Sequence, residues 1–411
     1  MLCVVKVARF SRKSIAWIFI LASFCVLAHI LLFEYMNELV QDVNNIFTVA
    51  IHRENSRLHG NIKFILIWES DYYISQEFYE VKNCSFANCF FTKDRNYMGD
   101  ITEFSAIIFD ENILDSTDRP MRRSESQIYV FNSLESSYNK PACDVNNDEF
   151  FNWTLTYRLD SDFTWSYFVV RNLTGHIVAP SVTAAWQTNV APIDQKIKTF
   201  LGRKKKAAAW LVSHCQADSF RDEYLTRLQE HLFHFALRID VYGECSQNVC
   251  PNGNCEEMLK EYFFYMAFEN SFSIDYVTEK VLHGYDNYAV PVVYGGANYS
   301  RFLPPGSYIN AREMHPYNLA FAMYKAIKDP NLYETYFKWT NLYTVESDAR
   351  ENHPLCGLCE AIHKEDNRVP AKEKFRLWWN NIDGMKWCLS EEYWNETALV
   401  NIDATHIFNL Y

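Results

Sequence analysis

The stretch from Phe263 to Pro305 limits the possible folds of this chain more than any other. It begins with an aromatic-rich apolar run, 263–268, of the length and composition of a buried strand. A polar loop, 269–275, is followed by a helical pattern from about Tyr276 and by a second apolar run, 289–294. Strand, loop, helix and strand within roughly thirty residues form a βαβ unit. We therefore expect a parallel sheet.

The polar loop of this unit is the first candidate for a binding site. Ligands of open α/β sheets bind at the carboxyl ends of the strands, and the loop follows such an end. We expect residues 269–280 to bind a substrate.

Length and charge narrow the class of protein. A chain of 411 residues is long enough for two domains with appendages. Its net charge of −12 argues against nucleic acid as a partner, because neutralising a phosphate backbone needs a basic face. A small molecule that carries a nucleotide needs only a few well-placed cations and remains possible.

Strand-length apolar runs alternate with helix-compatible segments through most of the chain, on both sides of a basic cluster at 203–206. We interpret that cluster as a solvated linker near a domain boundary. The expected fold is therefore α/β, with two domains facing a cleft. The expected limits are a stem at 34–60, a first domain at 61–200, a second at 201–345 and a tail at 346–411.

The N-terminal segment predicts the compartment. Residues 14–33 contain no Lys, Arg, Asp or Glu. An uncharged run of this length is long enough to span a membrane. Basic residues precede this run, so the positive-inside rule leaves residues 1–13 cytosolic and the remainder lumenal. A cleaved signal peptide is the alternative, but no small-residue cleavage site follows.

Sequons and cysteines agree with a lumenal body. Ten of the twelve cysteines follow the apolar segment, as in a protein of an oxidising compartment. Glycosylation sequons occur at Asn83, Asn152, Asn172, Asn298 and Asn395.

Several separate motifs resemble one family, the inverting α1,3/4-fucosyltransferases that use GDP-fucose. The resemblance is densest over FYMAFENSFSIDYVTEKVLHGYDNYAVPVVYGG and RFLPP in the opening stretch. It continues in WTLTYRLDSD, WLVSHCQADSFRDEYLTRL, DVYGEC, YFKW and CGLC, in the family's order. It implies a GT-B type fold of two Rossmann-like domains, preceded by a transmembrane helix and a stem. It also implies a type II Golgi membrane protein that transfers L-fucose to a GlcNAc hydroxyl on a glycoprotein glycan.

The resemblance assigns roles within the second domain. Lys280 and Arg221 correspond to cations on the departing diphosphate, which a helix N-terminus near Tyr276 would assist. Glu279 would reach the sugar. The other donor-binding positions that it implies are Ser213, Glu269, Asn270 and Tyr276, with Glu269 and Asn270 turned toward the nucleoside.

Glu135 is the candidate general base, because a sugar hydroxyl is a weak nucleophile and Glu135 matches the family's Glu-Ser position after a strand. Its motif, NSLESSYN, lacks the family's proline. A catalytically inactive lumenal relative that binds nucleotide or glycan is therefore the alternative. Asp160 and Asp162 are rival carboxylates, and a glycoside hydrolase would use such a pair.

Metal and disulfides complete the expectations. Asp160-Ser161-Asp162 has the spacing of a divalent-metal motif, but the expected cations make a metal unnecessary, so no cofactor is required. The family pattern ties Cys356 and Cys359 to Cys84 and Cys89. Cys215 would pair with one of Cys245, Cys250 or Cys255, since sequence does not fix connectivity.

Overall fold

The structure is a computed structural model of the 411-residue chain. It describes residues 62–68, 74–81, 84, 88–187, 191–246, 248, 250, 255–347, 353–364, 369–385 and 388, together with His29, Leu32 and Met36. Residues 1–62 and 63–411 are separate units, and the sheets and helices discussed below belong to the second.

A parallel six-stranded sheet forms the first half of this unit. Its order is β2-β1-β3-β4-β5-β6, and each neighbouring pair is parallel. Its strands β1, β3 and β4 form from the apolar runs at 62–68, 104–109 and 128–131, which are of strand length. The bounds are β1 Lys63–Ile67, β2 Cys89–Thr92, β3 Ala106–Phe109, β4 Ile128–Ser133, β5 Trp153–Thr156 and β6 Phe163–Thr164.

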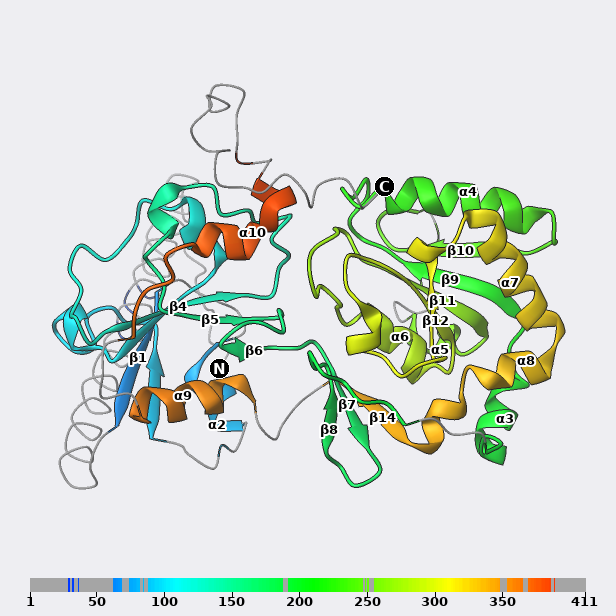
Figure 1. Ribbon diagram of the computed structural model, residues 1–411, viewed down its shortest axis with the longest axis horizontal. Coiled ribbons are helices and arrows are strands. Elements are labelled where there is room, and N and C mark those ends of the chain that lie inside the picture. The colour runs from blue at the N-terminus through cyan, green and yellow to red at the C-terminus, as the bar shows by residue number, and fades with distance from the viewer. Residues whose placement is uncertain are drawn as a thin grey trace, which may run out of the picture. The chain divides into compact units, whose positions relative to one another are not determined.

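Helices cover both faces of this sheet, and two of them come from the C-terminal end of the chain (Figure 1). Leu355 and Leu358 of α9 (Pro354–Lys364) pack with alternate strand residues such as Ile65, in a cluster that includes α2 (Gln76–Val81). Trp379 of α10 (Phe375–Met385) lies against Phe131 of β4, with ring centroids 4.9 Å apart. The segment expected to be a tail therefore completes the first domain's core.

A second parallel sheet has the order β10-β9-β11-β12-β13. The stretch that opens at Phe263 forms its centre, and the predicted βαβ unit is present. The bounds are β9 Lys206–Leu211, β10 Ile239–Tyr242, β11 Tyr262–Phe268, β12 Val290–Tyr294 and β13 Ile309–Asn310, with helices α3 Gln195–Leu201, α4 Arg221–Phe233, α5 Glu256–Leu259, α6 Lys280–Asp286, α7 Pro316–Lys328 and α8 Pro330–Thr335.

Strand β11 shows how this sheet is buried on both sides. Phe264 and Met266 belong to the core shared with α4 and α7, whereas Tyr265 and Ala267 belong to the core shared with α6. Successive side chains of a strand point to opposite faces, so a continuous apolar run suits a strand with helices on each face. The run therefore contains no polar residue.

A small antiparallel sheet, β14-β7-β8, joins the core of the second domain. Its strands are β7 Val169–Asn172, β8 Ile177–Ala179 and β14 Tyr343–Glu346. The domain boundary was expected near residue 200. Residues 168–179 precede that point in the sequence, but they pack with the second domain. The short 3-10 helices are η1 Ile101–Glu103, η2 Glu111–Asp115, η3 Val145–Asn147, η5 Tyr299–Arg301, η6 Ala311–Glu313 and η7 Lys338–Asn341.

The basic cluster at 203–206 differs from the expected solvated linker. The Lys204 side chain is buried, and its ammonium donates to the carbonyl of Asn287 at 2.7 Å. Burial lowers the pKa of Lys204 to about 7. Lys206 already lies in β9.

The expected fold needs one correction, which concerns the membrane. In the part of the chain that the structure describes, none of the helices has the length and apolar character needed to span a bilayer. Apart from His29 and Leu32, the segment at 14–33 to which the spanning helix was assigned lies outside the described residues.

Five disulfides connect the ten cysteines that follow the apolar N-terminal run. Cys84 is bonded to Cys356 and Cys89 to Cys359, which are the partners that the resemblance implies, and Cys215 is bonded to Cys245. The other two, which sequence left open, are Cys143–Cys388 and Cys250–Cys255.

Candidate active site

A cavity of about 370 Å³ lies at the carboxyl ends of the second sheet's central strands. Its position is where the strand order reverses between β9 and β11, the place at which open α/β sheets bind ligands. Its lining residues are Leu211, Val212, Ser213, His214, Arg221, Tyr242, Gly243, Cys250, Cys255, Tyr265, Asn270, Glu279, Lys280 and His283.

Gly243 allows two strand ends to meet beside this cavity. Its φ is +103°, and a Cβ there would lie 2.4 Å from the carbonyl oxygen of Val212. Any side chain would therefore clash and be strained as well. A glycine is therefore required at this position of the cavity wall, next to the ends of β9 and β10.

Lys280 brings a positive charge to the cavity. Its ammonium donates to Thr278 Oγ1 at 2.8 Å and lies 3.2 Å from Glu269 Oε2 and 3.5 Å from Glu279 Oε1. Burial would lower the pKa of Lys280, but the two carboxylates, Glu269 foremost, raise it above its ordinary value. The side chain is therefore charged at neutral pH.

The resemblance implied that Glu269 turns toward the nucleoside, but in the structure its side chain is buried away from the cavity wall. Its carboxylate is 1% exposed, does not line the cavity and accepts from Thr278 N and Oγ1 at 2.8 and 3.0 Å. Burial raises the pKa of Glu269, and Lys280 opposes that rise. Glu269 therefore acts on the cavity through Thr278 and Lys280.

Gly295, directly after β12, makes room for Glu269. A Cβ on Gly295 would lie 2.5 Å from Tyr299 Oη and 3.2 Å from Glu269 Cγ. A larger residue would displace the buried carboxylate that holds Lys280. Gly295 is thus a packing requirement of the site.

Arg221 is fixed by backbone carbonyls at the edge of the cavity. Its guanidinium donates to Phe268 O at 2.8 Å and to His214 O at 2.6 Å, and the residue is 2% exposed. Burial lowers the pKa of Arg221. Its Nε is buried with no hydrogen-bond partner among the described residues.

Asn270 offers a second unpartnered polar atom at the same cavity. Its Oδ1 is buried without a hydrogen bond from any residue that the structure describes. Buried polar atoms are normally paired, so an orphan on a cavity wall fits a ligand donor. Ser213 lines the cavity as well, and the structure therefore brings Ser213, Arg221, Asn270, Glu279 and Lys280 together.

The helix expected from about Tyr276 begins four residues later. Helix α6 starts at Lys280 and has seven residues, and Glu279 precedes it as its N-cap without a side-chain capping bond. Asp275 has a φ of +59°, outside the helical region, so residues 275–279 form an irregular loop. The positive helix end proposed near Tyr276 is therefore absent there.

Tyr276 is also placed differently from the donor-binding position that the resemblance implies. It is 3% exposed, does not line the cavity, and its phenol donates to Glu135 Oε1 at 3.0 Å. Burial raises the pKa of Tyr276 far above its ordinary value, so it remains a donor. Tyr276 connects the donor-side loop to the candidate base.

The Glu135 carboxylate is held by one oxygen. Oε1 accepts from Ser136 N at 2.7 Å, from Asn139 Nδ2 at 3.0 Å and from Tyr276 Oη at 3.0 Å. Oε2 receives no hydrogen bond from the described residues. The carboxylate, half-buried, lies two residues beyond the end of β4.

Serines join the Glu135 loop to the loop after β11. Ser271 Oγ donates to Ser136 Oγ at 2.6 Å, and Ser137 Oγ lies 3.4 Å from Ser273 Oγ. Ser137 occupies the place of the family's proline, and its N–H donates to Tyr157 Oη at 3.2 Å. Proline has no N–H, so this bond depends on the departure from the family pattern.

Asp160 and Asp162 are not a pair. Asp160 is bound by Arg158 at 2.8 Å and by the Trp378 indole at 3.1 Å, whereas Asp162 accepts from Thr154 N at 2.8 Å and lies 3.0 Å from Lys372. Within the described ranges, the one cluster with metal-ligand geometry is Cys89, Cys359 and His363, whose cysteines are joined as a disulfide.

Burial separates the sequons. Asn152 is 6% exposed, and its side chain accepts from Tyr129 N at 2.7 Å and donates to Val369 O at 2.7 Å. A glycan on Asn152 would break these bonds, so we expect this sequon to be unoccupied. Asn298 is exposed, and Asn172 begins the exposed turn between β7 and β8. Asn83 and Asn395 lie outside the described residues.

Four residues that bring aromatic rings to the cavity were not among the predicted binding residues: Tyr242, Tyr265, His283 and His214. Tyr242 and Tyr265 lie on strands, where an aromatic residue in an apolar run is normally core. Only the adjacency of β10, β9 and β11 turns them into cavity walls.

Two parallel sheets, the second with a charged cavity at its strand-order reversal, are typical of two-domain α/β proteins that bind nucleotide ligands. Two family models match the chain: "Fucosyltransferase, N-terminal" over residues 60–168, and "Glycosyltransferase family 10 (fucosyltransferase) C-term" over residues 201–378. The chain belongs to glycosyltransferase family 10, the fucosyltransferases.

Individual proteins resemble the chain to different extents. Alpha-(1,3)-fucosyltransferase C of Drosophila melanogaster is 34% identical over 359 residues, which cover 82% of each protein. Human alpha-(1,3)-fucosyltransferase 4 is 31% identical over 62% of this chain and 46% of its own length. A crystal structure of an alpha1,3-fucosyltransferase with GDP-fucose aligns over 75% of this chain and 92% of its own, at 15% identity and a TM-score of 0.46.

Proposed function

We propose that the chain transfers L-fucose from GDP-fucose to a GlcNAc hydroxyl of a glycoprotein glycan, forming an α1,3 linkage with inversion. The observation that carries this proposal is the cavity at the strand-order reversal of a family 10 chain, which presents a charged lysine beside unpartnered polar atoms of Arg221 and Asn270. Its relative in Drosophila is named as an α-(1,3)-fucosyltransferase.

Lys280 and Arg221 have the placement needed for the leaving group. As the bond between fucose and the diphosphate breaks, negative charge develops on the diphosphate oxygens. Cations that are already fixed stabilise that charge without reorganising during the reaction. Glu269 and Thr278 hold the Lys280 ammonium, and two carbonyls hold Arg221.

Glu135 has the geometry of a general base. Three donors fix Oε1, which leaves Oε2 to accept the proton of the acceptor hydroxyl. The hydroxyl oxygen then bonds to the anomeric carbon as the electron pair of the breaking bond passes to the diphosphate. One displacement from the face opposite the leaving group inverts the anomeric centre.

Two cations at the cavity also lead us to propose that transfer requires no divalent metal. Lys280 and Arg221 supply the positive charge that a metal would bring to the diphosphate. Asp160 and Asp162 have separate partners, so metal binding between them would break existing bonds.

The disulfides support a location in the secretory lumen, which for this reaction we propose to be the Golgi. Long-range bonds such as Cys89–Cys359 persist in an oxidising compartment. The exposed Asn298 sequon, and the Asn172 sequon at an exposed turn, are consistent with passage through it.

Purified protein incubated with GDP-fucose and a panel of GlcNAc-bearing acceptors tests the proposal, with parallel reactions in excess EDTA. We expect fucosylated product with release of GDP, and equal rates with and without EDTA. GDP binding without transfer to any acceptor would favour an inactive binding relative instead. Loss of transfer in EDTA, restored by Mn²⁺ or Mg²⁺, would overturn the metal-independent reading.

A further inference from the structure

The C-terminal helix α10 contacts the segment that follows Glu135, although the contacting residues are far apart in sequence. Trp379 Nε1 donates to Lys140 O at 2.8 Å. Asn380 Nδ2 donates to Ala142 O, and Ala142 N donates to Asn380 Oδ1, both at 2.8 Å. The backbone at Lys140 and Ala142 is thus bonded to α10.

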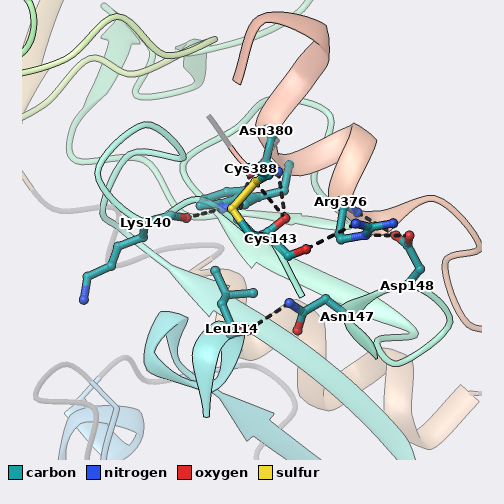
Figure 2. The surroundings of a disulfide bond; sticks show 10 residues. Leu114, Lys140, Cys143, Asn147, Asp148, Arg376, Asn380 and Cys388 are labelled. Carbon is teal, nitrogen blue, oxygen red and sulfur yellow. Dashed lines mark hydrogen bonds and ion pairs between the residues drawn. A yellow bond between two sulfur atoms is a disulfide. The ribbon is translucent and has the colours of Figure 1, made fainter. Parts of the chain in front are cut away.

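The same segment is tied down at its far end, as Figure 2 shows. Cys143 forms a disulfide with Cys388, and its carbonyl accepts from Arg376 Nη1 at 3.2 Å. Arg376 also binds Asp148 at 2.8 Å, and Asn147 donates to Leu114 O at 2.9 Å. Residues 140–148 are therefore fixed between α10 and the 3-10 helix η2.

One turn connects this anchored segment to the carboxylate. Lys140 N donates to Ser136 O at 3.0 Å, which closes the turn 136–140. Within that turn, Asn139 Nδ2 donates to Glu135 Oε1 at 3.0 Å. A shift of the Lys140 carbonyl would move Asn139, and with it the oxygen that it holds.

Trp379 also packs against the strand that leads to Glu135. The residue is fully buried, its ring lies 4.9 Å from that of Phe131 in β4 and 5.9 Å from that of Tyr157, and its carbonyl accepts from Arg158 at 3.2 Å. The indole therefore fixes both ends of the connection, the strand before Glu135 and the turn after it.

We propose that α10 is a positioning element for fucose transfer, in which Trp379, Asn380 and the Cys143–Cys388 bond fix residues 140–143 and thereby the Glu135 carboxylate. The inference rests on the proposed role of Glu135. We assign these side chains a positioning role that is exerted through the turn 136–140. Misplacing a catalytic group by a small distance lowers the rate of the chemical step while substrate binding elsewhere is unaffected.

Trp379→Phe tests this, because it keeps an aromatic ring in the core and removes the indole N–H that Lys140 O accepts. We expect kcat to fall by about tenfold, with the KM for GDP-fucose and the Kd for GDP unchanged. Trp68→Phe is the matched control: Trp68 is also buried, and its indole donates to Asp118 O at the same 2.8 Å. The control should keep the wild-type kcat.

The double variant Trp379→Phe/Glu135→Gln separates positioning from general damage to the fold. We expect it to be no slower than Glu135→Gln alone, because a base that is absent cannot be misplaced. Arg376→Lys keeps the charge beside Asp148 and removes the bond to Cys143 O. It should show the same pattern more weakly. This variant replaces Trp379→Phe in the test if Trp379→Phe does not fold.

The outcomes distinguish this inference from the function on which it rests. An unchanged kcat for Trp379→Phe, or an equal further loss in the Glu135→Gln background, would overturn the role of α10 and leave the base in place. Full turnover by Glu135→Gln alone would overturn the base itself, and the positioning role with it.

Discussion

The phenol of Tyr276 donates a hydrogen bond of 3.0 Å to Oε1 of Glu135, across 141 residues of sequence. Tyr276 lies in the loop after β11, and Glu135 lies in the loop after β4. The loop that carries Tyr276 continues into Lys280 at the donor cavity. One short segment thus contacts both the candidate base and the candidate leaving-group site.

Tyr276→Phe should lower kcat by about tenfold while leaving the affinity for GDP intact, since a bond to a charged acceptor contributes about 1.5–3 kcal/mol. The ring contact with Tyr157, 5.0 Å between centroids, remains in the variant. Steady-state kinetics and calorimetric GDP titration measure both quantities. Tyr333→Phe is the control, because Tyr333 is equally buried and its phenol donates to Phe263 O at 2.6 Å, away from Glu135. Loss of GDP binding in Tyr276→Phe would contradict this assignment.

Lys280→Met should weaken GDP binding and nearly abolish transfer. It should also lower the free energy of unfolding by about 3 kcal/mol, because it leaves the buried Glu269 carboxylate without its cation. Adding Glu269→Gln removes that stranded charge, so the double variant should regain most of the stability. GDP titration and chemical denaturation of both variants provide the measurement. If the double variant also recovered GDP affinity, Lys280 would be structural only.

Lys204 should make stability rise with pH above neutrality. Burial lowers its folded pKa to about 7, below the unfolded value near 10.4. The unfolded chain therefore binds more protons between these values, and the free energy of unfolding increases as pH rises through this window. Between pH 7 and pH 10, the unfolding free energy of the wild type should rise relative to that of Lys204→Met. A pH-independent difference would show that Lys204 keeps its charge inside the fold, with a pKa near the unfolded value.

Glycosylation should distinguish the sequons by burial. Protein secreted from a glycosylating host should carry glycans at Asn172 and Asn298 and none at Asn152, whose side chain is bonded on both its oxygen and its nitrogen. Peptide mass spectrometry with and without glycosidase treatment reports the occupancy of each site. Substantial occupancy at Asn152 in folded, active protein would contradict the packing described for that residue.

The strands of both sheets could be predicted because their signal is local. A doubly covered parallel strand needs a continuous apolar run, and such runs mark β1, β3, β4, β9, β11 and β12 within a residue or two of their observed ends. The start of α6 was predicted less well. Val277 and Val281 have helical spacing, and both pack into the core. Only Val281 lies in a helix, however, because Val277 belongs to the irregular loop before it. Periodicity alone does not separate these cases.

The site itself divides between sequence and structure. Arg221, Asn270 and Lys280 could be named from their motifs, and the structure places them at one cavity. The roles of Glu269 and Tyr276 could not, because a polar residue in a loop has the same sequence signature whether it faces a ligand or a buried partner. Their partners, Lys280 and Glu135, become neighbours only when the chain is folded.

By itself, the sequence determined the two parallel sheets, the loop after β11 as a candidate ligand site and the pairing of Cys356 and Cys359 with the first domain. These follow from local hydrophobic patterns and from motifs that resemble a known family. Only the tertiary structure decided that Asn152 is buried, that Lys204 is inside the fold and that α10 returns to hold the Glu135 turn. Each depends on contacts between residues distant in sequence, because burial and hydrogen-bond partners are properties of the packed chain.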